Sequence, residues 1–137
     1  MATAALGEWD SADSIAVMIG LDSWHPTAGT RVTIDRIGTP KVFTGGELVP
    51  KPASTARSKW DFGAELGEQA LVEVPFSEMV LIPRHVKTKE VRTFLNGRAV
   101  GDVMDAATPE PKATDATGRS PQRFVIEVES NARRGVP

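Results

Sequence analysis

The sequence predicts an α+β domain built on a mostly antiparallel, mixed sheet of about five strands with about two short helices. Segments with the residue types and alternation of strands outnumber segments with helical spacing. The links between these segments are rich in glycine and proline, as in hairpins and loops. No repeated strand-helix-strand spacing is present, so a doubly wound parallel fold is disfavoured.

The first strand is predicted at residues 15–21, where apolar residues at both parities indicate burial on both faces. A helix of about two turns is expected near residues 28–37, capped by a threonine. The β-branched residues at 31–34 leave a strand there as the alternative. Residues 40–50 predict a hairpin around Gly45 and Gly46, and residues 50–59 a surface loop.

The second half of the chain contains further strand patterns and one short helix. Residues 76–82 have helical spacing, with Ser77 as the expected cap and Pro83 as the expected end. Trp60 and Phe62 lie on one side of an extended segment, which is more typical of a core than of a ligand-stacking pair. Further strands are predicted at residues 70–74, 91–95 and 124–129, and a long exposed loop at residues 101–121.

Length and composition describe an ordinary globular protein. The 137 residues suit a single domain, residues 1–137, with a substantial core. Hydrophobic residues make up 40% and charged residues 25%, which argues against disorder and fibrous repeats. The sixteen Lys and Arg are interspersed with eighteen Asp and Glu, so we expect no nucleic-acid partner. The absence of cysteine excludes disulfides and thiolate sites and is compatible with the cytoplasmic location that we expect.

Neither a membrane span nor a leader is expected. The longest apolar run, residues 15–21, is far shorter than the roughly 18 to 20 residues that cross a bilayer. Residues 1–6 are apolar but lack a basic leader and are followed at once by Gly7 and Glu8. We therefore expect no membrane partner and no removal of a segment.

Familiar catalytic and cofactor motifs are missing from the sequence. No two of the twelve glycines are separated by a single residue, so the chain has no dinucleotide-binding fingerprint and no Rossmann domain is predicted. Phosphate-loop, nucleophile-elbow and zinc motifs are also absent. Only two histidines occur, His25 and His85, and neither has a partner at ligand spacing. We therefore expect this chain to bind neither a cofactor nor a metal ion.

Two short segments nevertheless carry groups that suit ligand contacts. His25 follows Trp24 on the loop after the first strand, where it contacts a ligand or, alternatively, hydrogen-bonds the backbone. Arg84 and His85 follow the short helix, where they hold a carboxylate substrate or, alternatively, form a solvated helix end.

Several separated segments resemble, in order and spacing, the part that follows the nucleotide-binding domain in bacterial saccharopine-dehydrogenase-like oxidoreductases. In that family an N-terminal Rossmann domain binds NAD or NADP, and the following α+β domain closes over it and supplies substrate and dimer contacts. The segments that carry the resemblance are 13–15, 21–31, 46–50, 60–62, 74–78, 83–85 and 115–124.

The resemblance implies that this chain is the substrate-side part of such an enzyme, inactive alone. The glycine fingerprint is missing and the chain stops just after the last strand, as in a truncated or split reading frame or an excised fragment. For a complete relative it implies hydride transfer between NAD or NADP and a carbon–nitrogen or carbonyl-type substrate. The expected partner is a separate Rossmann domain or a second copy in a homodimer. The residues expected to face the cleft between the domains are Trp24, His25, Thr27, Gly29, Thr30, Arg84 and His85.

Two other functions fit the same residues. The chain is alternatively a free-standing protein-binding or oligomerisation module without catalytic activity, using the sheet face that a Rossmann domain would have covered. A small independent enzyme using His25 or His85 is the third hypothesis.

Overall fold

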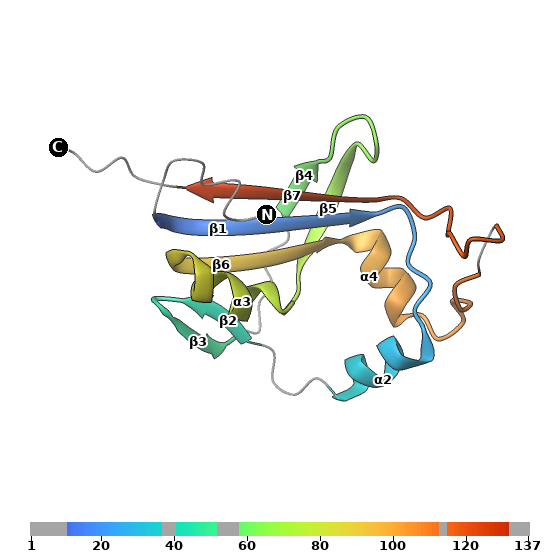
Figure 1. Ribbon diagram of the computed structural model, residues 1–137, viewed down its shortest axis with the longest axis horizontal. Helices are drawn as coiled ribbons and strands as arrows, with labels where there is room; N and C mark the ends of the chain where they lie inside the picture. The colour runs from blue at the N-terminus through green and yellow to red at the C-terminus, as the bar shows by residue number, and fades with distance from the viewer. Residues whose placement is uncertain (1–10, 37–40, 52–57, 113–114, 132–137) are drawn as a thin grey trace.

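The computed structural model describes residues 11–36, 41–51, 58–112 and 115–131 (Figure 1). These residues form one mixed sheet of seven strands with three helices, which confirms the predicted α+β class and the mostly antiparallel sheet. The expectations for residues 1–6 and for most of the loop at 50–59 lie outside the described residues. The elements are β1 (Ser11–Leu21), α2 (Ala28–Arg36), β2 (Lys41–Thr44), β3 (Glu47–Pro50), β4 (Ser58–Asp61), β5 (Glu68–Glu73), α3 (Glu78–His85), β6 (Lys87–Asn96), α4 (Gly97–Met104) and β7 (Phe124–Asn131).

Strands β1 and β6 form the centre of the sheet. The main strand order is β3-β2-β6-β1-β7, and the β4–β5 hairpin joins the sheet through pairing of β5 with β6. β1 and β6 run parallel, whereas every other pairing among the described strands is antiparallel. The prediction that β1 is covered on both faces is confirmed, because Ile15 and Val17 are buried on one face and Met18 on the other.

One face of the sheet packs against α3. Val91 of β6 and Ile15 of β1 are register partners and meet Met79 of α3 and Phe43 of β2 in one cluster. α3 lies over β6 and β2 rather than over β1 and β7 (Figure 1). Burial of these side chains is the main stabilising term on this face.

The opposite face is closed by the β4–β5 hairpin, which lies behind β1 and β7 in Figure 1. Phe62, just after β4, is 3% exposed and packs with Met18 and Phe94. The indole N–H of Trp60 donates to Glu127 Oε2 of β7 at 2.9 Å, so β4 reaches across to the far edge of the sheet. The prediction that Trp60 and Phe62 serve the core is confirmed.

The predicted hairpin and the first predicted helix are both confirmed. Gly45 and Gly46 have φ angles of 61° and 82°, as the tight turn between β2 and β3 requires. The helical alternative was correct for α2, and the Thr27 hydroxyl accepts the backbone N–H of Thr30 at 3.2 Å.

The prediction that Pro83 ends its helix is wrong. α3 continues through Pro83 to His85, and Val86 N–H donates to Ile82 O at 2.8 Å to close the last turn. Because a proline removes only its own N–H bond, one further turn can form where neighbouring side chains are buried. Ser77 occupies the cap position but makes no side-chain capping bond.

The predicted loop at residues 101–121 begins later than expected, because α4 extends to Met104. Ala99 and Val103 of α4 are buried. Gly97 and Gly101 lower the intrinsic helix propensity of this stretch, so burial of one face decides its structure. Ser58 likewise begins β4 inside the loop expected at 50–59. No helix among the described residues is long and apolar enough to cross a membrane.

Candidate functional site

The loop after β1 meets two described parts of the connection between α4 and β7 at one end of the sheet. Since β1 and β6 are parallel, the segments that follow them leave from the same edge, and the segment that leads into the antiparallel β7 arrives there. In Figure 1 these loops lie on the right, beyond the tips of β1 and β6. The carboxyl edge of parallel strands is where α/β proteins commonly bind ligands.

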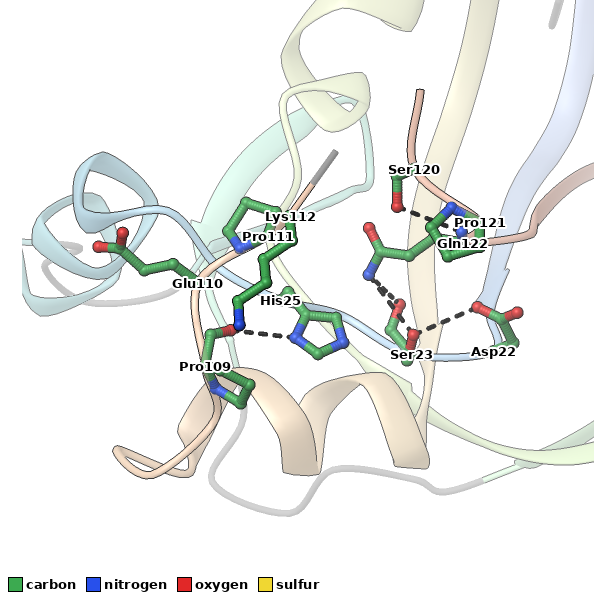
Figure 2. Close-up of a pocket in the computed structure, with 10 residues that line it drawn as sticks. All are labelled: Asp22, Ser23, His25, Pro109, Glu110, Pro111, Lys112, Ser120, Pro121 and Gln122. Atoms are coloured by element: carbon green, nitrogen blue, oxygen red, sulfur yellow. Dashed lines mark hydrogen bonds between the residues drawn. The ribbon is translucent and has the colours of Figure 1, made fainter. Parts of the chain in front are cut away.

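The loops enclose a pocket of about 400 Å³, a volume within the usual range for small-molecule sites (Figure 2). We call it the His25 pocket. Its lining residues are Asp22, Ser23, His25, Pro109, Glu110, Pro111, Lys112, Ser120, Pro121 and Gln122.

Asp22 and Gln122 are held by contacts between the loop after β1 and the segment before β7. Asp22 is bonded twice to the backbone of Arg123: Asp22 N–H donates to Arg123 O at 3.1 Å, and the side-chain Oδ1 of Asp22 accepts Arg123 N–H at 3.1 Å. Gln122 Nε2 donates to Ser23 O at 2.9 Å. Both side chains are half-buried, so they are fixed relative to the sheet.

His25 joins the loop after β1 to the loop after α4. Its Nδ1 lies 3.0 Å from the carbonyl oxygen of Pro109 (Figure 2). Because a carbonyl oxygen only accepts, the proton of this bond lies on Nδ1, and Nε2 is the ring nitrogen that points away from Pro109. His25 therefore hydrogen-bonds the backbone, which is one of the two roles expected for it, and it also lines the pocket, whereas a contact with a ligand stays a prediction.

Arg31 and Asp102 fasten the surrounding loops. The guanidinium of Arg31 in α2 donates to three carbonyl oxygens, those of Val103, Asp105 and Thr108, at 3.5, 3.2 and 2.9 Å. Asp102 Oδ2 accepts the backbone N–H of Trp24 at 2.9 Å. These contacts hold the loop after β1 and the loop after α4 together. Since α2 has no buried residue, hydrogen bonds rather than core packing fix its position.

Arg31→Met is expected to lower the free energy of unfolding by about 1–2 kcal/mol, because it removes three charge-assisted bonds from a partly exposed group. Amide exchange at residues 105–108 is expected to speed up more than exchange in β1. Arg36→Met, an equal change at the exposed end of the same helix, is the control. Equal effects of the two changes would contradict the role of Arg31.

The segment that leads to the pocket from the other side is shaped by Asp115. The Thr117 hydroxyl, 2.6 Å from Asp115 Oδ1, holds the pKa of Asp115 below its ordinary value, and the backbone N–H of Arg119 adds to this effect. Gly118 supplies a positive φ of 79° at the turn. The fully exposed carboxylate thus organises the turn just before Ser120.

The structure separates the predicted site residues into two groups. Only His25 lines the pocket, Trp24 contributes its backbone N–H nearby, and Thr27, Gly29 and Thr30 form the first turn of α2 and the residue before it. Arg84 and His85 lie at the other end of β1, since Lys87 pairs with Ser11. The ten steps along β1 correspond to roughly 33 Å. The two groups therefore do not form one site within this chain.

Sequence reasoning missed most of the pocket. Gln122 and Ser23 are 99 positions apart, and no local pattern signals their contact. Asp22 and Ser23 could have been predicted from their position, since polar residues directly after a buried strand lie at a sheet edge. Glu110 and Lys112 lie within a proline-rich stretch that indicates only a loop.

Comparison with known proteins leaves the family open: no protein-family model matches this chain, and no curated protein matches it. The described part of the chain also contains no group of three or more His, Asp or Glu side chains that could hold a metal ion.

Proposed function

We propose that this chain is the substrate-side module of a saccharopine-dehydrogenase-like oxidoreductase and works together with a nucleotide-binding domain. The observation that carries the proposal is the partly exposed apolar face of β7 and of the end of β1. The resemblance of the sequence segments supplies the enzyme class. The His25 pocket supplies a place for the substrate.

The open face consists of neighbouring side chains from the two strands. Ile19, near the end of β1, pairs with Ile126 in the sheet register, and Val128 lies on the same face of β7. Ile19, Ile126 and Val128 are only half-buried. Phe124, which begins β7, is 66% exposed. In Figure 1, α3 lies below β1 and β7, beside β6.

A contiguous apolar sheet face marks an interaction surface more often than a solvated one. Sheets are normally covered by a second layer, and the second layer described on this face is confined to α3 and its neighbours. A nucleotide-binding domain packed against β1 and β7 would complete the layer. The proposal therefore gives β7 a structural role in docking.

The residues of the chain are a poor fit for a nicotinamide dinucleotide. The described strand–loop–helix unit of β1 and α2 has no glycine between Leu21 and Ala28, so the backbone cannot approach a pyrophosphate closely. Asp22 and Asp102 place carboxylates beside that loop, which repel phosphate. The chain's own part in the proposed reaction is to bind and orient the substrate.

Titration of the purified chain with NADH and NADPH, followed by nicotinamide fluorescence, tests the first half of the proposal. No saturable binding is expected. Saturable micromolar binding of either nucleotide would overturn the assignment of this chain to the substrate side.

The open face leads to a second measurement. Phe124→Ser is expected to reduce the fluorescence of bound anilinonaphthalene sulfonate, because it removes the most exposed aromatic ring from the face. Val32→Ser on α2 is the control, since Val32 is 48% exposed but lies away from β7. An equal decrease in both variants would show that the dye does not report on the β1–β7 face.

A second candidate function is an oligomerisation module that uses the same face. The observation that favours it is the position of β7 at the end of the described strand order, which leaves one strand edge for pairing. Sedimentation at several concentrations separates the two functions. A dimer that Phe124→Ser dissociates would support the module, whereas a monomer throughout would support the oxidoreductase part.

A further inference from the structure

Two side chains of the His25 pocket are held in orientations that leave an acceptor atom available. The side-chain amide of Gln122 is oriented by Ser23 O, which can only accept, so Nε2 faces that carbonyl and Oε1 is left as an acceptor. His25 is oriented in the same way by Pro109 O, which leaves Nε2 as an acceptor. Within the described residues, no group donates to Gln122 Oε1 or to His25 Nε2.

The charged side chains of the pocket also favour a cationic ligand. Asp22 and Glu110 contribute two carboxylates, and Lys112 contributes one ammonium group. With a neutral His25 the lining carries one excess negative charge. Asp22 Oδ1 is engaged by Arg123 N–H at 3.1 Å and faces the Ser23 hydroxyl at 3.4 Å, which leaves Oδ2 without a described donor.

From these groups we infer that the His25 pocket binds the primary ammonium group of a small organic ligand. An ammonium group donates three hydrogen bonds and carries the charge that the lining lacks. His25 Nε2, Gln122 Oε1 and the Asp22 carboxylate are the acceptors that it meets. Carboxylate and phosphate ligands are disfavoured, because the two carboxylates of the lining repel them and Lys112 offsets only one of these charges.

The rest of the ligand is apolar and compact. Three prolines, Pro109, Pro111 and Pro121, line the pocket with rigid apolar rings. The volume of about 400 Å³ accommodates a ligand of a few carbon atoms with room for water. The name substrate for this ligand rests on the proposed function, whereas its binding is a property of this chain alone.

Titration of the whole chain with n-butylammonium, with n-butyrate and butan-1-ol as probes of the same length, tests the inference by NMR. The ammonium probe is expected to shift the His25 ring and Gln122 side-chain amide signals in a saturable way. Butyrate and butan-1-ol are expected to leave these signals unchanged. Absence of a saturable shift with butylammonium, or an equal shift with butyrate, would overturn the inference.

Charge-neutralising variants locate the site. Asp22→Asn and Glu110→Gln are each expected to weaken butylammonium binding about threefold to tenfold, because each removes a pocket carboxylate while keeping its shape. Lys112→Gln is expected to strengthen binding about twofold to fivefold, since it removes the one cation of the lining. Glu68→Gln is the matched control, because Glu68 is an exposed carboxylate of β5 outside the pocket.

An equal loss of affinity in Glu68→Gln and Glu110→Gln would overturn the inference, because it would report only the net charge of the protein. Glu110 is exposed, so its variant keeps the test valid if Asp22→Asn does not fold. The titration with NADH and NADPH tests the proposed function, whereas the titration with butylammonium tests the ligand of the pocket. A negative result in one is therefore distinguishable from a negative result in the other.

Discussion

Asn96→Ala is expected to lower the free energy of unfolding by about 2–4 kcal/mol. Asn96 is fully buried at the end of β6, with 0% exposure. Its Oδ1 accepts Leu21 N–H at 3.0 Å, and its Nδ2 donates to Leu21 O at 2.8 Å. The side-chain amide therefore pairs with the last residue of β1 as a neighbouring strand would. Alanine would leave the partly buried N–H and C=O of Leu21 without these partners.

Urea unfolding at equilibrium measures the effect, provided that the slope of the transition is unchanged. Gln69→Ala is the control, since Gln69 contacts the same amide only at 3.4 Å and is partly exposed. Its expected effect is below about 1 kcal/mol. A loss below about 1 kcal/mol for Asn96→Ala would mean that water replaces the amide at Leu21.

Asn96→Ala is also expected to change the loop that lines the His25 pocket. Leu21 immediately precedes Asp22, whose carboxylate lines the pocket. The amide of Asn96 thus determines where β1 ends and where the ligand-binding loop begins. Loss of this contact is expected to broaden the NMR signals of Ser23 and His25 together with those of Leu21.

Local sequence patterns were sufficient for the elements whose structure depends on near neighbours. Apolar residues at both parities predicted β1, and the pair Gly45 and Gly46 predicted the turn between β2 and β3. α4 was not predictable in this way, because Gly97 and Gly101 disfavour a helix and the burial of Ala99 is a tertiary effect. Local rules fail where packing overrides propensity.

The candidate site was predictable only in part, for a topological reason. His25 could be placed at a sheet edge because it follows a buried strand. The place of His85 depends on whether the strand that follows it runs parallel or antiparallel to β1. An antiparallel β6 would have brought His85 beside the end of β1, whereas the observed parallel register places it beside the beginning. Strand direction is not encoded in the local pattern.

Gly20→Ala is expected to lower the free energy of unfolding by about 1–3 kcal/mol. Gly20 is buried in β1 and faces the turn between β4 and β5. A Cβ atom there would lie 2.7 Å from Leu66 Cδ1 and 3.0 Å from Phe62 Cζ. Leu66 can change its rotamer, but Phe62 is 3% exposed and has no free space to enter.

Gly101→Ala is the control for Gly20→Ala, and it is expected to act with the opposite sign. Gly101 lies in α4, and a Cβ atom there would meet nothing within 4 Å. Alanine is expected to raise the free energy of unfolding by about 0.5–1 kcal/mol, because it reduces the backbone freedom of the unfolded chain. Urea unfolding measures both variants. A neutral Gly20→Ala would mean that residues 62–66 can move away from β1, so that the hairpin would not close this face of the sheet.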